Sequence, residues 1–219
     1  MKKQAIVIGL GQFGMSVARA LAGREVEVLA LDTNEERVRA ASEFATESAV
    51  LDATDEQALS QISPQRRDVC ICAIGDEARE ASIIVTALLR QLGAQRIVAR
   101  ANDRIHARIL RLVGASQVVN PEEEYGKRFA SQVLYQEIRG ELSFGGGVLI
   151  NELSVPESFV GHALSELELP RRYGVIIVAI RQSRTGAVLL PQPDARLEQG
   201  DVMVVVAQEG AVARMMEKS

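Results

Sequence analysis

Three glycines near the start of the chain have the spacing that points most directly to chemistry. Gly9, Gly11 and Gly14 form the pattern G-x-G-x-x-G directly after residues 4–8, an apolar run that predicts a buried strand. The first glycine of such a pattern permits a tight turn, the second lets the backbone approach a pyrophosphate, and the third lets a helix pack closely on the strand. The helix that follows would begin with free N–H groups, which suit a phosphate. The pattern predicts a phosphate-binding turn; a glycine-rich turn that binds nothing is the alternative.

An acidic residue stands where the ribose of a nucleotide would lie. Asp32 comes 18 residues after Gly14 and ends the stretch VEVLALD, which predicts the second strand. A carboxylate at this place accepts hydrogen bonds from ribose hydroxyls. Because it repels a 2′-phosphate, NADP is disfavoured, whereas NAD, ATP, ADP and AMP all remain open.

A parallel sheet would bring these residues together, and the first 120 residues carry the pattern of one. The predicted strands are 4–8, 26–31, 47–51, 68–74, 96–101 and 116–119. The predicted helices are 12–23, 34–44, 55–61, 77–92 and 103–113. Short apolar strands that alternate with amphipathic helices predict an α/β Rossmann domain over residues 1–120, with both faces of its parallel sheet covered.

A different kind of segment begins at residue 120. Asn120 is a good N-cap and Pro121 suits a first helical turn, so a helix is predicted over 121–138. Its apolar residues recur at helical spacing: Tyr125, Phe129, Val133 and Leu134. Since no further strand of the same sheet follows, we expect this stripe to form an arm between subunits or domains. A terminal helix that folds back on its own sheet is the alternative.

The run Gly145-Gly146-Gly147 predicts a flexible joint or a sharp turn, because three glycines inside an element would be costly. We therefore expect a domain boundary here, with a crossover helix and linker over 121–144 and a second domain over 145–219. The predicted strands of that domain are 148–154, 174–182, 187–190 and 202–207, with a short helix in 161–169 and a terminal helix from 209. This mixture predicts a small α+β domain that dimerisation could support.

Composition argues against several classes of protein. The net charge is −4 and no basic stretch is dense, so nucleic acid is not expected as a partner. The longest apolar runs, VIIVAI and VMVVVA, are six residues long, well below the roughly 20 of a membrane span. The N-terminus leads straight into a strand and lacks the pattern of a signal peptide, so we expect a cytoplasmic protein.

The cysteines and histidines predict no catalytic centre. Cys70 and Cys72 lie two apart on a predicted strand, where small buried hydrophobic residues are the expectation. His106 and His162 fall in different predicted domains and suggest no Ser-His-Asp or Cys-His arrangement. We expect His106 on the surface of its helix.

Six stretches, taken together and in order, carry a resemblance that covers the whole chain. They are AIVIGLGQFG, LALDTNEERV, LDATDE, VARANDRIHARILRLVGASQVVNPEEEYG, GHALSELELPRRYGVIIVAIR and LEQGDVMVVVA. They resemble the RCK (regulator of K+ conductance) family, and within it the KtrA/TrkA-type cytoplasmic subunits of bacterial potassium uptake systems.

The resemblance implies a Rossmann half that binds an adenine nucleotide, ATP or ADP and in some relatives NAD or NADH. It implies a C-terminal half that in some relatives binds cyclic di-AMP. It further implies homodimers that assemble into an octameric ring on the inner face of the membrane, beneath a K+-translocating subunit of the TrkH/KtrB type. The nucleotide would change the shape of the ring and thereby gate the channel.

The resemblance also assigns expected site residues. The nucleotide-binding set is Gly9, Gly11, Gln12, Phe13, Gly14, Asp32, Asn34, Asp52, Thr54, Ala73, Ile74, Gly75 and Arg100. Asn34 has a helix cap as its alternative, and Asp52 with Thr54 has a turn and helix cap. Arg100 is expected near the phosphates, with a solvent-facing arginine as the alternative. The loop 76–80 is longer by one residue than in relatives, so the assignment stops at Gly75.

Gln12 and Glu122 bear on which phosphates and which cation the chain could bind. Gln12 stands where many relatives carry an arginine that reaches the terminal phosphate, so binding of an adenine nucleotide is expected more firmly than recognition of ATP. Glu122 matches a family glutamate that binds Mg²⁺ or Ca²⁺ between subunits, although a single carboxylate does not make a metal site.

Two functions from different classes follow from the sequence. The favoured one is a non-catalytic, nucleotide-sensing subunit that gates a potassium channel or transporter. The alternative is a small NAD-dependent oxidoreductase. Such an enzyme needs convergent acid, base or arginine groups in a substrate domain, and the C-terminal 70 or so residues show no such set.

Overall fold

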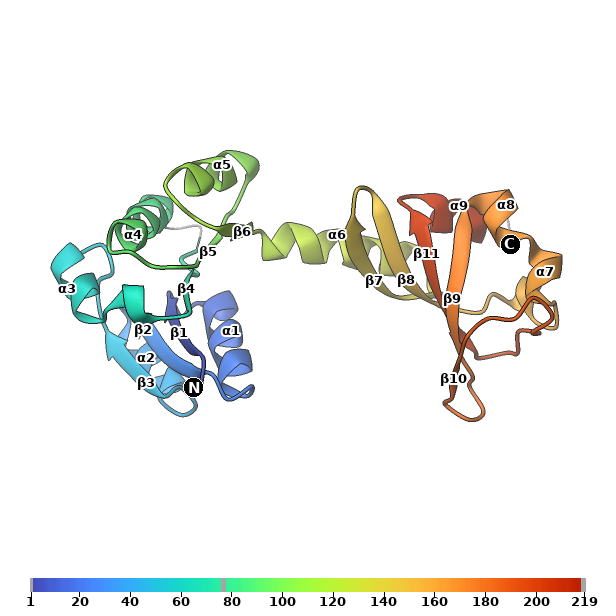
Figure 1. Ribbon diagram of the computed structural model, residues 1–219, viewed down its shortest axis with the longest axis horizontal. Coiled ribbons are helices and arrows are strands. Elements are labelled where there is room, and N and C mark those ends of the chain that lie inside the picture. Colours follow the sequence, from blue (N-terminus) through green and yellow to red (C-terminus); the bar gives the residue numbers. More distant parts are fainter. Residues whose placement is uncertain (1, 76–77, 218–219) are drawn as a thin grey trace. The chain divides into compact units, whose positions relative to one another are not determined.

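The computed structural model describes residues 2–75 and 78–217, which fall into two compact units, Met1–Glu123 and Glu124–Ser219 (Figure 1). The first residue of the predicted helix 77–92 lies outside the described residues. No helix in the described part of the chain combines the length and apolarity that a membrane span needs.

The N-terminal unit alternates strands and helices. Its strands are β1 (Gln4–Ile8), β2 (Glu27–Asp32), β3 (Glu47–Val50), β4 (Val69–Cys72), β5 (Ile97–Arg100) and β6 (Gln117–Val119). Its helices are α1 (Gln12–Ala22), α2 (Glu35–Ala41), α3 (Glu56–Gln61), the 3-10 turn Pro64–Arg66, α4 (Arg79–Gln91) and α5 (Arg104–Leu112). In the described residues the strands form one parallel sheet in the order β3-β2-β1-β4-β5-β6, which confirms the predicted Rossmann sheet.

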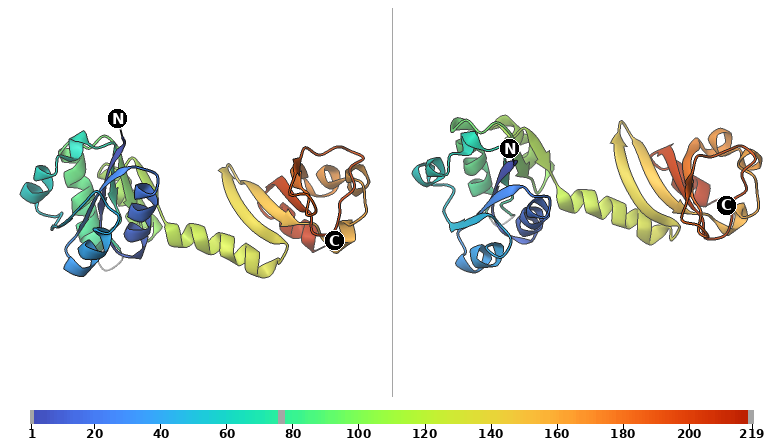
Figure 2. Two further views of the ribbon diagram at one scale, coloured as in Figure 1. Left: turned by 90° about the horizontal axis from the view of Figure 1, so that it is seen from below. Right: turned by 60° about the horizontal axis from the view of Figure 1, so that its bottom comes forward.

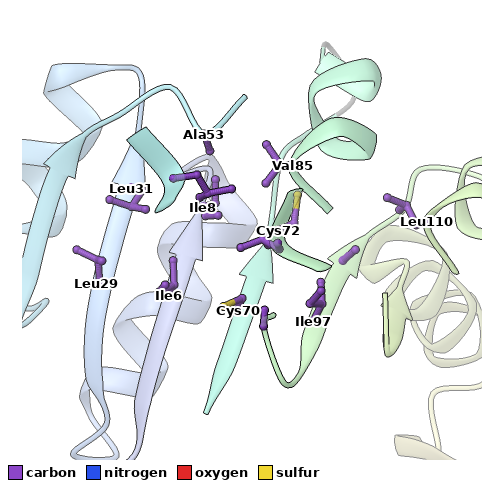
Figure 3. Close-up of a cluster of buried hydrophobic side chains, with 14 of the residues drawn as sticks. Ile6, Ile8, Leu29, Leu31, Ala53, Cys70, Cys72, Val85, Ile97 and Leu110 are labelled. Atoms are coloured by element: carbon purple, nitrogen blue, oxygen red, sulfur yellow. The ribbon is translucent and has the colours of Figure 1, made fainter. Parts of the chain in front are cut away.

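Helices cover both faces of this sheet (Figure 2). Alternate strand residues point to opposite faces, so β1 sends Ile6 and Ile8 into one core and Val7 into the other. The first core is closed by α3, α4 and α5, and Figure 3 shows its side chains between the strands and Val85 of α4. The second core is closed by α1 and α2. Burial on both faces explains why these strands read as nearly continuous apolar runs.

Two side-chain predictions have different outcomes. Cys70 and Cys72 are buried as expected, and burial raises the pKa of Cys70 to about 12 and that of Cys72 to about 11, so both stay as thiols. The prediction that His106 lies on a helix surface is wrong, because it is only 2% exposed and its Nε2 lies 2.8 Å from Ser82 Oγ of α4. His106 shares the inner face of α5 with Leu110, one helical turn on.

The C-terminal unit is built on an antiparallel sheet. Its strands are β7 (Ile138–Gly145), β8 (Val148–Ser154), β9 (Val175–Arg181), β10 (Val188–Leu189) and β11 (Val202–Gln208). Its helices are most of α6 (Pro121–Leu134), the 3-10 turn Glu157–Phe159, α7 (Leu164–Leu167), α8 (Leu169–Tyr173) and α9 (Ala211–Met216). Among the described residues the strand order is β10-β9-β11-β8-β7, and the small mixed domain is confirmed.

The triple glycine is a hairpin turn and not a boundary between domains. Gly145, Gly146 and Gly147 have φ of +101°, +61° and +79°, backbone values that glycine adopts without strain, and they join β7 to β8. The expectation of a sharp turn is therefore confirmed. The boundary expected at 145 is corrected, because β7 pairs with β8 in one sheet and the second unit begins at Glu124.

The helix predicted over 121–138 ends earlier, at Leu134, because the chain enters β7 at Ile138. In the described structure α6 buries none of its residues. The rings of Tyr125 and Phe129 stack at 5.8 Å between centroids, and both side chains are at least half exposed, as are Val133 and Leu134. A partner for this apolar stripe stays a prediction.

Candidate nucleotide-binding site

The N-terminal unit contains a cavity of about 460 Å³ at the carboxyl ends of its strands, a size typical of small-molecule sites. Nine of the thirteen expected residues line it: Gly9, Gly11, Asp32, Asp52, Thr54, Ala73, Ile74, Gly75 and Arg100. Figure 3 shows two further lining residues, Ile8 and Ala53, close together at this end of the sheet. In an open parallel sheet, ligands bind at this edge, where the strand order reverses.

The three glycines have three different surroundings. Gly9 has φ +90°, and a Cβ there would lie 3.0 Å from the backbone nitrogen of Ile74. A Cβ on Gly14 would lie 1.8 Å from the carbonyl oxygen of Gly9, so helix α1 needs glycine to pack against the turn. A Cβ on Gly11 would meet no described atom within 4 Å. Gly9 and Gly14 therefore shape the turn, whereas Gly11 leaves open space on the cavity wall where a phosphate would fit.

Asp32 ties the glycine turn to the end of β2. The residue is 7% exposed, its Oδ2 accepts a 2.6 Å hydrogen bond from the backbone N–H of Leu10, and its Oδ1 accepts one of 2.8 Å from the backbone N–H of Asn34. An ionised carboxylate has about four acceptor positions, so both oxygens keep capacity for ribose hydroxyls. The role expected from the sequence, acceptance of bonds from ribose hydroxyls, stays a prediction, whereas the bond to the glycine turn was not expected from the sequence.

The cap alternative is confirmed for Asn34 and the turn alternative for Asp52 and Thr54, whereas the cap of α3 is Asp55. The Asn34 side chain accepts a 3.1 Å bond from the N–H of Arg37 and caps α2, and Asn34 is not among the lining residues. Asp52 Oδ1 accepts bonds from the hydroxyl and the N–H of Thr54, and these lower the pKa of Asp52. Asp52 and Thr54 also line the cavity, so turn formation leaves a role at the adenine open.

Arg100 supplies positive charge at the end of β5. Its side chain is 14% exposed, which rules out the solvent-facing alternative, and its Nη2 donates a 2.7 Å hydrogen bond to Glu122 Oε1. The guanidinium carbon lies 5.8 Å from the ring centre of Phe13, which places Phe13 beside the cavity without lining it. Arg100 thus lies on the wall of the cavity, and its role toward phosphates stays a prediction.

Sequence reasoning missed a second cation. Arg37, on the first turns of α2, lines the cavity with its Nη1 3.6 Å from Asp32 Oδ2. The position of Arg37, three residues after the Asn34 cap, could have predicted this role, because it places the side chain on the side of the helix that faces Asp32.

The remaining expected residues fall outside the cavity lining. Gln12 is exposed at the start of α1, and Gly14 is buried beneath the turn. Glu122 is engaged with Arg100, and the described residues contain no group of three or more histidine, cysteine, aspartate or glutamate side chains that could hold a metal ion. Residues 2–75 and 78–217 of a single chain therefore supply no fitting metal site at Glu122.

The ionisable groups of the cavity are suited to binding. Among its described lining residues they are Asp32, Arg37, Asp52 and Arg100, and each is held by a neighbour. Two carboxylates and two guanidiniums can accept bonds from hydroxyls and donate bonds to phosphates. Space for a phosphate at Gly11, an acceptor at Asp32 and a cation at Arg100 fit a nucleotide.

Comparison with known proteins shows the family to which the two units belong. The TrkA-N domain model matches residues 5–121, and the TrkA-C domain model matches residues 151–219. Ktr system potassium uptake protein A of Vibrio alginolyticus is 32% identical over 217 residues, covering 98% of this chain and 97% of that protein. Ktr system potassium uptake protein C of Bacillus subtilis (strain 168) is 30% identical over 218 residues, covering 100% of this chain and 98% of that protein.

Solved structures show the same fold. The GsuK RCK domain matches with a TM-score of 0.65 at 19% identity, over 99% of this chain and 47% of that chain. This chain thus spans about half of that structure. With both domain models matched in order and relatives at 30% and 32% identity over nearly their whole length, the chain belongs to the TrkA-N/TrkA-C family of potassium uptake proteins, built on the RCK fold.

Proposed function

We propose that the chain is a nucleotide-sensing regulatory subunit of a potassium uptake system and that it has no catalytic activity of its own. The observation that carries the proposal is the cavity, where Gly11, Asp32 and Arg100 converge in a TrkA-N domain. Its ligand is an adenine nucleotide with a free 2′-hydroxyl, with ATP, ADP and NAD or NADH as candidates.

In this proposal each end of the cavity holds a different part of the nucleotide. The glycine turn and Arg100 bind the phosphates, because backbone N–H groups and a guanidinium both donate to anions. Asp32 accepts bonds from the ribose hydroxyls. The adenine lies near Asp52 and Thr54, and the backbone after β4 (residues 73–75) closes the other side.

Assembly and gating form the second part of the proposal. Chains pair through the exposed stripe of α6, dimers form an octameric ring on the cytoplasmic face of the membrane, and the bound nucleotide sets the shape of the ring. The ring gates a K+-translocating subunit of the TrkH/KtrB type. The names of the Ktr relatives support a role in potassium uptake, and the exposed Tyr125 and Phe129 support a partner for α6.

The proposal includes two further ligands, a divalent cation and cyclic di-AMP. A Mg²⁺ or Ca²⁺ ion at Glu122 would need carboxylates from more than one chain. Titration of the oligomer with each cation tests this, since Glu122→Gln should remove binding and an unchanged affinity would refute it. Cyclic di-AMP at the C-terminal unit is tested by calorimetry with the full chain, and absence of heat at saturating ligand would refute it.

The decisive experiment combines ligand identity with ion flux. Native mass spectrometry of the purified protein reports the oligomer and any retained nucleotide. Vesicles that contain the membrane subunit then report K+ flux with ATP, ADP or NAD and this chain. Nucleotide-dependent flux supports the proposal, whereas turnover of NADH with a small substrate and no effect on flux would favour the oxidoreductase alternative.

A further inference from the structure

One ion pair connects the cavity to the first turn of helix α6. Arg100 lines the cavity, and its Nη2 lies 2.7 Å from Oε1 of Glu122. The two side chains differ in exposure: that of Arg100 is 14% exposed and that of Glu122 is 61% exposed. The guanidinium is therefore held by the protein, whereas the carboxylate reaches it from the solvent side and can return to water.

Arg100 keeps donor capacity that the described residues do not use. Its Nε is buried and has no hydrogen-bond partner among them. Its Nη1 lies 3.5 Å from where a Cβ of Gly75 would be, so the guanidinium runs along the backbone that follows β4. A buried donor without an acceptor is costly, and a ligand oxygen in the adjoining cavity would supply the acceptor.

We infer that Glu122 competes internally for the anion position of Arg100, and that the phosphates of a bound nucleotide displace it. The inference rests on the proposed nucleotide binding at this cavity. A guanidinium offers a planar fork that a phosphate engages with two parallel bonds, here Nε and one Nη. A carboxylate left beside that phosphate would be repelled, and an ion pair whose carboxylate is 61% exposed is weak enough to exchange.

The displaced residue lies where the chain passes from one unit to the next. Glu122 is the second residue of α6, and the N-terminal unit ends at Glu123. Occupancy of the phosphate position therefore changes a contact at the start of the helix that leads into the second unit. A nucleoside without phosphate fills the ribose and adenine positions and leaves this contact in place.

The test is calorimetric titration of the full chain with ADP and with adenosine, using wild type, Glu122→Gln and Glu124→Gln. Glu124→Gln makes the same charge change two residues further along α6. Removal of the competitor in Glu122→Gln should tighten ADP binding about twofold to fivefold, the range expected for an ion pair that is open to solvent on one side, and should leave adenosine binding unchanged. Glu124→Gln should bind both ligands as wild type does.

A double variant separates competition from general electrostatics. In an Arg100→Gln background, Glu122→Gln should no longer change ADP affinity. Weaker ADP binding in Glu122→Gln would overturn the inference, because it would mean that Glu122 orients Arg100 for the ligand. Equal tightening in Glu122→Gln and Glu124→Gln would also overturn it. Unchanged ADP affinity in Glu122→Gln would overturn the inference and leave the proposed function standing. Failure of the wild type to bind both ADP and adenosine would instead refute the proposed function.

Discussion

Replacing Asp32 by alanine should lower the stability of the N-terminal unit and nearly abolish its stabilisation by ADP. The structure gives the carboxylate two tasks: it accepts the backbone N–H groups of Leu10 and Asn34, and it is proposed to accept ribose hydroxyls. Alanine removes both sets of bonds. The two tasks predict two separate losses, one in the free protein and one in the ligand response.

The size of each loss follows from the number of hydrogen bonds that alanine removes. A hydrogen bond to a charged group contributes about 1.5 kcal/mol or more, so the two backbone bonds predict a loss of about 3 kcal/mol and a fall in Tm of roughly 6–12 °C. Wild type at an ADP concentration of about 100 Kd gains about 2.7 kcal/mol. Two lost ribose bonds raise Kd by roughly 160-fold, so the variant at the same concentration gains only about 0.3 kcal/mol.

The assay is thermal unfolding with and without ADP, and the chain offers a matched control. Asp55 caps α3 and also accepts two backbone N–H bonds, from Gln57 and Ala58, but it does not line the cavity. Asp55→Ala should lose about 1 kcal/mol, as a helix cap does, and keep the full ADP gain. If Asp32→Ala gains as much from ADP as wild type does, the ribose assignment is wrong.

Three other predictions follow from the turn and from α6. Gly14→Ala should fail to fold stably, because its Cβ would lie 1.8 Å from a carbonyl oxygen. Gly11→Ala should fold normally and weaken ADP binding about tenfold. Normal ADP affinity in Gly11→Ala would place the phosphates elsewhere. Wild type should discriminate weakly between ATP and ADP in competition binding. Gln12→Arg should shift preference toward ATP about tenfold, or about 1.4 kcal/mol. A wild type that already strongly prefers ATP, with no change in Gln12→Arg, would refute this role of Gln12. Sedimentation at micromolar concentration should show at least a dimer, and a lone species at the monomer mass of 23.8 kDa would contradict the role given to α6.

Much of the N-terminal unit could be predicted from the sequence because its signals are local. Buried parallel strands need short apolar runs, and the helices between them show their own period, so element types and approximate bounds followed from neighbouring residues. The glycine turn at 9–14 could also be predicted, because Gly9 and Gly14 lie where any side chain would collide with the backbone. The edge of the sheet at which Asp32 and Arg100 both lie follows from parallel topology alone.

Strand β7 was missed although it carries a local signal. The segment IRGELSFG alternates apolar Ile138, Leu142 and Phe144 with polar residues between them, a period that favours a strand, but glycines at 140 and 145 weaken that signal. Its hydrogen-bond partner is β8, so the glycines at 145–147 form a hairpin turn where the sequence predicted a domain boundary. His106 is a similar case, since only the packing of α5 against α4 decides that its side chain faces Ser82.

The contacts that give the site its character were decided by the tertiary structure. Asp32 meets Leu10 and Arg100 meets Glu122, each across 22 residues of chain. The sequence determined which of these residues carry charge and roughly where each strand ends. It could not determine which donor each carboxylate meets, because that choice depends on the angle and spacing at which the sheet holds separate strand ends, and a hydrogen bond forms only within a few tenths of an ångström of its ideal length.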